Sequence, residues 1–187
     1  MAKRDNHYEA AFEAYLRARR IPYVAVDEAK RSLLGGGTLK SVDFILTPPR
    51  PGSCGCRDQG TAWLADIKGR RFPAGRQKQF WKNWSTSDEL RSLARWEELL
   101  GKQFTGLLVF AYHVVGPFAP LPAEQLFPFR GELYGFVGIR LHHYTSCSHT
   151  ISPKWDTVAM PVAKFRELSE PMDCLLGLSS PQVQVAT

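Results

Sequence analysis

Apolar residues along this chain recur with two periods, one typical of amphipathic helices and one typical of buried strands. Helical spacing predicts a first helix over residues 6–20, which Pro22 ends, and a second long helix over residues 87–100. Two nearly continuous apolar runs, at residues 62–65 and 105–115, are typical of strands covered on both faces. The pattern therefore predicts an α/β protein.

Shorter segments of alternating or apolar character complete the predicted sheet, and a short helix follows them. Together with the two apolar runs they predict a central mixed β-sheet of about five strands flanked by helices. The predicted strands are residues 23–26, 41–46 and 132–141, with an edge strand at 157–162; the helix is 161–168, and residues 142–152 are predicted to be irregular.

The 187 residues are enough for one domain, which we place at residues 1–178, followed by a polar tail at 179–187. No apolar run approaches the roughly 20 residues that a membrane-spanning helix requires. The first residues are polar and basic, unlike the apolar region of a signal peptide. We therefore expect a cytoplasmic protein with reduced cysteines and no membrane contact.

The net charge is +6, which favours anionic partners, and nucleic acid first among them. Much of this charge follows Lys68, where Arg70, Arg71, Arg76 and Lys78 are candidate contacts to phosphate groups. The alternative is the solvated face of a helix. The interleaved aromatic residues have helical spacing, which favours a place in the core over stacking on bases; they are Phe80, Trp81 and Trp84.

The sharpest candidate chemistry lies where the apolar run at residues 62–65 gives way to charge. Asp66 and Lys68 are two residues apart, so in a strand their side chains project from the same face. A carboxylate and an ammonium group at a strand end can hold a divalent metal ion beside a polarised water, which is the chemistry of phosphodiester hydrolysis. For the tripeptide alone, an ion pair at a strand edge is the simpler interpretation.

Two further acidic residues strengthen the metal interpretation. Asp43 interrupts an apolar strand, where a carboxylate needs a cation, a hydrogen-bond donor or a metal ion as partner. If its strand lies beside that of Asp66, the two carboxylates bracket a Mg²⁺ ion, and Lys68 orients the attacking water or offsets charge on phosphorus. Glu9 in the first helix could complete the ligand set, although its position three residues after Asn6 equally fits a capping box.

A second candidate metal site is weaker, because the spacing of its residues fits no standard zinc motif. A polar loop with a half-buried cysteine is the simpler interpretation. Elsewhere, His113 lies in an apolar strand and is predicted to be a core histidine. The candidate zinc ligands are His142, His143, Cys147 and His149, with Cys54 and Cys56 as further thiols.

The order of these acidic and basic residues resembles the PD-(D/E)xK nuclease superfamily, in particular its Holliday-junction-resolvase-like branch. Asp43, Asp66 and Lys68 match the motif positions and Glu9 the acidic residue of the first helix, while Val42 replaces the usual proline. The resemblance implies a restriction-endonuclease-like core and a Mg²⁺- or Mn²⁺-dependent endonuclease. It also implies a nucleic-acid substrate, DNA more than RNA, and a possible homodimer.

The resemblance assigns roles residue by residue. Metal binding falls to Glu9, Asp43 and Asp66, and catalysis to these three with Lys68. In many members a glutamine or basic residue on the following helix also faces the site, a place that Gln77 or Gln79 could take. The nucleic-acid-binding set is Arg70, Arg71, Arg76, Gln77 and Lys78.

The segment His7-Tyr8-Glu9-Ala10-Ala11-Phe12-Glu13 is similar in full to the signature of the HYExAFE family, a name that describes a sequence and no activity. His7 is accordingly a candidate neighbour of the site, or else a surface residue at the helix start. Two other functions remain open. One is a nucleic-acid-binding module that keeps the nuclease fold without hydrolysis, and the other is a structural or partner-binding protein in which Asp66 and Lys68 are simply paired.

Overall fold

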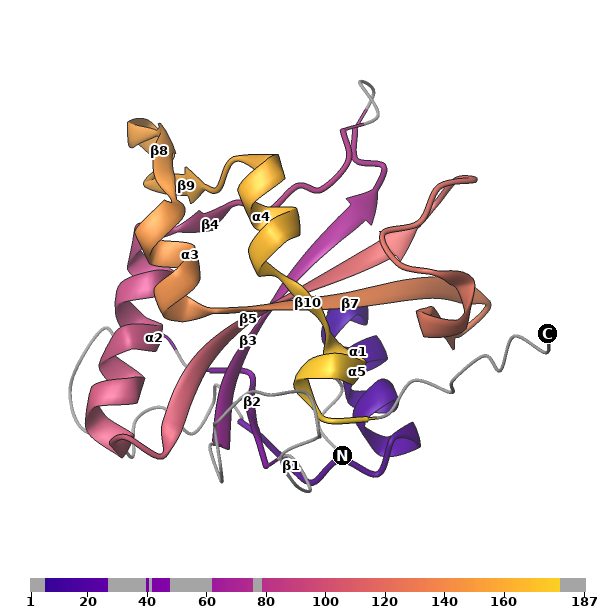
Figure 1. Cartoon of the computed structure of the whole chain (residues 1–187), viewed down its shortest axis with the longest axis horizontal. Coiled ribbons are helices and arrows are strands. Elements are labelled where there is room, and N and C mark those ends of the chain that lie inside the picture. Colours follow the sequence, from indigo (N-terminus) through magenta and orange to yellow (C-terminus); the bar gives the residue numbers. More distant parts are fainter. Residues whose placement is uncertain (1–5, 27–39, 41, 48–61, 76–78, 179–187) are drawn as a thin grey trace, which may run out of the picture.

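The computed structural model describes residues 6–26, 40, 42–47, 62–75 and 79–178, and is built around a curled, mixed sheet of seven strands (Figure 1). The strands of this sheet are β1 (Tyr23–Ala25), β2 (Phe44–Leu46), β3 (Ala62–Phe72), β5 (Phe104–Val114), β6 (Phe127–Phe129), β7 (Glu132–Arg140) and β10 (Glu170–Pro171). A second, three-stranded sheet has the order β4 (Ser85–Thr86), β9 (Thr157–Ala159) and β8 (His149–Ser152).

The strand order in the large sheet is β1-β2-β3-β5-β7-β10, with β6 paired to the outer end of β7. β3 and β5 run parallel over eleven residue pairs, and the other pairs are antiparallel. A parallel pair needs a crossover connection, which the longest helix supplies between β3 and β5. The helices are α1 (His7–Ala18), α2 (Ser87–Leu100), α3 (Leu141–Cys147), α4 (Val162–Leu168) and α5 (Met172–Leu175), with 3-10 turns at Ala123–Gln125 and Pro153–Trp155.

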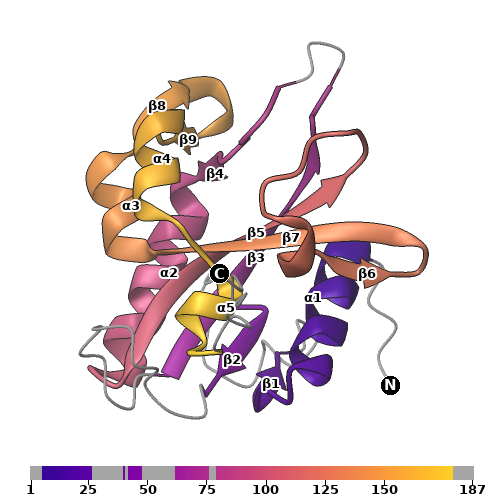
Figure 2. The same ribbon diagram turned by 45° about the vertical axis from the view of Figure 1, so that its right-hand side comes forward.

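Two apolar cores lie on opposite faces of the sheet, and Figure 2 shows α1 and α2 on its two sides. α1 and α5 cover one face, and α2, α3 and α4 cover the other. Alternate residues of β3 divide between the two cores: Trp63, Ala65 and Ile67 face α1, and Leu64 and Phe72 face α2.

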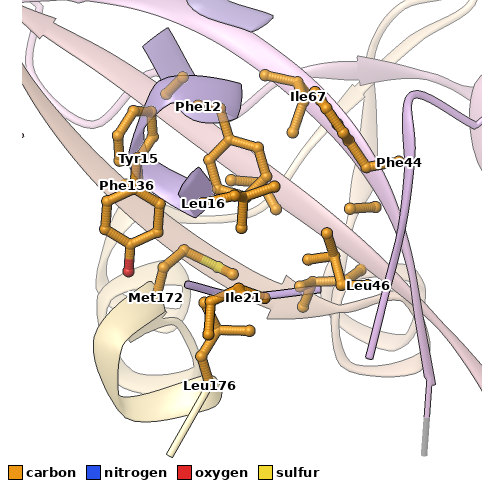
Figure 3. Packing of buried hydrophobic residues seen from close by; sticks show 14 of the residues in the cluster. Phe12, Tyr15, Leu16, Ile21, Phe44, Leu46, Ile67, Phe136, Met172 and Leu176 are labelled. Atoms are coloured by element: carbon orange, nitrogen blue, oxygen red, sulfur yellow. The ribbon is translucent and has the colours of Figure 1, made fainter. Parts of the chain in front are cut away.

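The core on the α1 face is rich in aromatic side chains (Figure 3). Phe12 of α1 has its ring centroid 5.5 Å from that of Phe44 in β2 and 5.1 Å from that of Phe136 in β7. Tyr15 and Leu16 are also buried, and Tyr15 donates a hydrogen bond to Asp173. These contacts hold the whole helix on the sheet, so the first turn of α1 has a fixed place beside β3.

The start of α2 is held by its own capping box and by the second sheet. Thr86 and Glu89 form a reciprocal capping box, in which each side chain accepts a hydrogen bond from the other residue's backbone N–H. The carbonyl of Asp156, a residue with left-handed φ of 48°, accepts a hydrogen bond from the Ser87 N–H. The first turn of α2 is therefore fixed more firmly than helix propensity alone would achieve.

The α/β prediction is confirmed, and both long helices form, but the sheet has seven strands where about five were expected. The extra strands are the two- and three-residue segments β6 and β10, too short to leave a periodic pattern. The segment predicted to be irregular forms α3 and β8 instead. The segment expected as an edge strand, residues 157–162, contributes β9 to the second sheet.

The strand of Asp66 does not end on its charged residues, as the sequence suggested, but continues to Phe72. β3 pairs with β5 along its whole length. This pairing outweighs the low strand propensity of the charged residues that follow Ala65. The basic helix expected after it is absent from the described residues 79–84. There Gln79 pairs with Ala74, and Trp81 has a positive φ of 57°, both incompatible with a continuous helix.

Candidate functional site

The site begins just before β2, where the side chain of Asp43 replaces the backbone as the hydrogen-bond partner of β3. Phe44 pairs with Ala65, and continuing this antiparallel register places Asp43 opposite Asp66. The Asp43 N–H still donates to the Ala65 carbonyl over 3.0 Å, but the next bond of the ladder runs from the Ile67 N–H to Asp43 Oδ2, 2.7 Å away. The Asp43 carboxylate thus takes the place of a backbone carbonyl and is fixed against β3, as the adjacent-strand prediction required.

Lys68 lies between two carboxylates. Its Nζ is 2.7 Å from Asp66 Oδ2 and 2.9 Å from Glu89 Oε2, and only 7% of the residue is exposed. Glu89 Oε2 also accepts hydrogen bonds from the Ser85 hydroxyl and the Thr86 N–H. The ammonium group therefore has a single, well-defined position on the α2 face of β3.

The carboxyl groups differ sharply in their electrostatics. Burial, together with the charges of Asp66 and Glu9, raises the pKa of Asp43 to about 8, although the hydrogen bond from the Ile67 N–H acts to lower it. Burial also raises the pKa of Asp66, although Lys68 opposes it, and a hydrogen bond joins the two carboxyl groups. Burial would raise the pKa of Glu89, but Lys68 and the Thr86 N–H lower it to about 2. The surroundings thus favour the protonated form of the aspartate pair and the ionised form of Glu89.

These groups line an open pocket of about 190 Å³, and Glu9 lies in its wall. Glu9 contacts the start of its own helix and also lies close enough to Asp43 to act on its charge. Its Oε1 accepts a hydrogen bond from the Asn6 side chain, which in turn caps α1 by accepting from the Tyr8 N–H. At the same time its charge acts on Asp43. The pocket is lined by Glu9, Lys40, Val42, Asp43, Asp66, Ile67, Lys68, Glu89, Ser92, Leu93 and Trp96.

Glu89 is the site residue that sequence reasoning missed. It was assigned only to the first turn of a helix, where acidic residues are common. The signal was available: a helix that connects two parallel strands packs on the sheet, and Lys68 projects toward that helix if Leu64 is buried beneath it. A lysine is rarely buried without a carboxylate partner, so a further acidic residue is expected near the start of that helix.

The basic residues after Lys68 divide into two kinds. Arg70 is largely committed to the protein, since its guanidinium lies 3.9 Å from the Trp84 ring centroid and donates to the carbonyls of Gly69 and Trp84. Arg71 is exposed, on the opposite face of β3. Arg76, Gln77 and Lys78 lie outside the described residues.

Among the described residues, no three His, Cys, Asp or Glu side chains are arranged to hold a metal ion by themselves. This finding gives no support to the weaker candidate, a zinc site at His142, His143, Cys147 and His149, which α3 and β8 distribute along a helix and a strand. Cys54 and Cys56 lie outside the described residues. His113 is half-buried and pairs with Glu132, which is compatible with a structural histidine.

The Asp43–Asp66 pair nevertheless suits Mg²⁺ or Mn²⁺. Mg²⁺ commonly binds proteins through only one or two carboxylates and completes its shell with water and substrate phosphate. Two neighbouring carboxyl groups that line an open pocket are a set of oxygen donors that a divalent cation can use. The Ile67 N–H and the Lys68 ammonium hold the two carboxyl groups in place at this edge of the pocket.

Two variants of Glu89 distinguish its contribution as a cap of α2 from its contribution as the ion-pair partner of Lys68. We expect Glu89→Gln to lower the free energy of unfolding by about 1 kcal/mol, because glutamine keeps the capping box but not the ion pair. Glu89→Ala should cost about 2 to 3 kcal/mol, since it also removes the cap. Urea unfolding measures both, with the exposed Glu98→Gln as control. Equal losses for the two variants would contradict the role of the charge.

The architecture defines a class of protein, an α/β fold with a curled mixed sheet that is consistent with the restriction-endonuclease-like fold. A solved structure with this arrangement is Hjc of Archaeoglobus fulgidus, a Holliday junction resolvase from an archaeal hyperthermophile. The TM-score is 0.50 and the sequence identity 11%, over 91% of this chain and 98% of that chain. This likeness shows a nuclease-like fold.

No model of a known protein family matches the chain, and no curated protein matches it in sequence. The HYExAFE resemblance therefore still depends on the heptapeptide alone. None of the described helices is long and apolar enough to cross a membrane.

Proposed function

We propose that this protein is a Mg²⁺- or Mn²⁺-dependent endonuclease that hydrolyses phosphodiester bonds in nucleic acid, with DNA the preferred substrate. One observation carries the proposal: a hydrogen-bonded pair of half-buried aspartates and a buried lysine line one open pocket on a nuclease-like fold. A pair of carboxylates with an ammonium group is the donor set that metal-assisted phosphodiester hydrolysis uses.

Each residue has a role in this proposal. Asp43 and Asp66 would hold the metal ion, which when bound supplies Lewis-acid polarisation of the phosphate and an activated water. Glu9, in the pocket wall, would accept a hydrogen bond from that water. Lys68 would present a fixed positive charge where negative charge develops on the phosphoryl oxygens. Its two carboxylate partners keep the ammonium protonated, so its role is electrostatic and not that of a base.

The basic residues extend the proposed site. Arg71 is exposed and suited to a backbone phosphate, and we assign Arg76, Gln77 and Lys78 to the same surface from their place in the sequence. Arg70 is better suited to holding the end of β3 in place, because its guanidinium is occupied by Trp84. The nucleic-acid contact at this end of β3 would thus depend more on Arg71 than on Arg70.

The test is cleavage of labelled branched, flap, single-stranded and linear duplex DNA, with an RNA strand beside them, in Mg²⁺, Mn²⁺ or EDTA. We expect metal-dependent cutting of at least one substrate by the wild type and none by Asp66→Asn, which keeps the shape of the side chain. Salt-sensitive binding without cutting, in wild type and variant alike, would favour a binding module instead. The pairing of Lys68 with both Asp66 and Glu89 favours another candidate, a structural or partner-binding protein in which Asp66 and Lys68 are simply paired, and neither cutting nor binding in this test would support it.

A further inference from the structure

A second group of polar side chains lies beyond the pocket, at the far end of β3. Arg71 of β3 is in register with His113 of β5, which is in register with Tyr134 of β7. The first two residues of α1, His7 and Tyr8, lie over these three positions. We call the five residues the Arg71 cluster; the aspartate–lysine pocket does not contain any of them.

The contacts within the cluster are close. His7 Nδ1 and the Tyr134 hydroxyl are 2.8 Å apart, and the rings of His113 and Tyr134 stack with centroids 5.2 Å apart. The imidazoles of His7 and His113 are 5.7 Å apart, edge to face. The His7 and Tyr8 rings are 3.9 Å apart, and the positive charge of Arg71 acts on the Tyr8 phenol. One small surface therefore gathers two imidazoles, two phenols and a guanidinium.

The charge balance of this surface suits an anion. Glu132 is a carboxylate beside the cluster, and His113 Nε2 lies 2.8 Å from its Oε2. Within the described part of the chain, Arg71 is exposed and makes no ion pair with a carboxylate. A guanidinium beside ring N–H and phenol O–H donors matches the acceptor oxygens of a phosphate group.

The position of the cluster relates it to the pocket. Arg71 follows Lys68 by three residues, about 10 Å along a strand, a distance that one or two nucleotides of a nucleic-acid strand can span. Lys68 and Arg71 project to opposite faces, but β2 pairs with β3 only as far as Ala65. In the described chain, no strand covers that edge of β3 after Ile67. A strand of nucleic acid that follows this edge can reach both side chains.

We propose that the Arg71 cluster is a second phosphate subsite, which binds the sugar-phosphate backbone of the substrate strand one or two nucleotides from the scissile phosphate. Arg71 supplies the charge, and Tyr8, His7 and His113 supply hydrogen-bond donors and ring surfaces for the adjoining sugar or base. The inference rests on the proposed function, because it assigns both sites to one strand. It differs from that function in requiring binding and no hydrolysis.

The test uses binding in the Asp66→Asn background, so that cleavage does not interfere. Fluorescence anisotropy with a short labelled DNA strand, and with an RNA strand of the same sequence, is measured over a series of salt concentrations. Arg71→Gln should weaken binding about tenfold and reduce the salt slope by about one. His113→Gln should weaken binding with little change in slope.

The matched control is Arg95→Gln, which makes the same charge change at an exposed position of α2 that pairs with Glu98. Equal effects of Arg71→Gln and Arg95→Gln, or no binding by the background protein, would overturn the subsite. If binding depends on Arg71 while the wild type cuts no substrate, the subsite is supported and the endonuclease proposal fails. The two ideas therefore fail separately.

Discussion

Lys68→Met is expected to lower the rate of phosphodiester cleavage by about a hundredfold or more, because it removes a preorganised charge from the proposed transition-state site. Methionine keeps much of the length and apolar volume of the side chain, so the packing against α2 changes little. Asp66 and Glu89 lose the cation between them, which we expect to cost up to about 3 kcal/mol of unfolding free energy. Single-turnover cleavage and thermal unfolding measure the two effects.

The pocket supplies its own control. Lys40 lies in the same wall, but its side chain is 42% exposed and pairs with Asp88 at 3.3 Å. Lys40→Met makes the same chemical change without a buried partner, so cleavage should fall only a few-fold through weaker substrate binding. If both variants lose activity to the same extent, Lys68 acts through the general positive charge of the pocket and has no special position.

Gly69→Ala is expected to produce the largest loss of stability of any single methyl addition to β3. A Cβ atom on Gly69 would lie 2.1 Å from Tyr8 Cδ2 and 2.4 Å from Tyr8 Cγ, far inside contact distance. These atoms are near the root of the side chain, so a small rotation cannot clear them. Overpacking of this kind costs about 1 to 3 kcal/mol. Because Glu9 follows Tyr8, the displaced turn should also move Glu9 away from the pocket.

A double-mutant cycle tests this mechanism by urea unfolding. In a Tyr8→Ala background the ring is absent, and Gly69→Ala should then cost little, giving a coupling energy of about 1 to 2 kcal/mol. Gly116→Ala is the matched control elsewhere, since its Cβ would meet Pro73 at an ordinary 3.5 Å. Additive effects of the two substitutions would show that the loss arises from the β3 backbone and not from α1.

The features that the sequence predicted well are those with long or repeated patterns. The two long helices and the extended runs of β3, β5 and β7 were recognisable because each buries a regular set of apolar residues. The Asp43–Asp66 neighbourhood followed from placing two acidic residues on adjacent strands. Alternation also implied that Lys68 shares a face with Asp66.

What the sequence could not supply depends on contacts between distant segments. Glu89 is recognisable as a partner of Lys68 only once α2 is known to cover that face of β3. The persistence of β3 through Arg71 depends on eleven paired residues of β5, which outweigh a locally unfavourable composition. The two-residue strand β10 forms because β7 offers it a free edge, and no local signal marks it.

The carbonyl of Asp156 bonds to the first turn of α2, and its Oδ2 accepts from the Asp88 N–H over 3.2 Å. That turn carries Glu89, which fixes Lys68. The small sheet therefore helps to hold the buried lysine in position, although it contributes no residue to the lining of the pocket. Substitutions in the turn between β8 and β9 offer protein engineers a way to change the orientation of α2 on the sheet. The position of the Lys68 ammonium group would change with it, while every pocket residue stays the same.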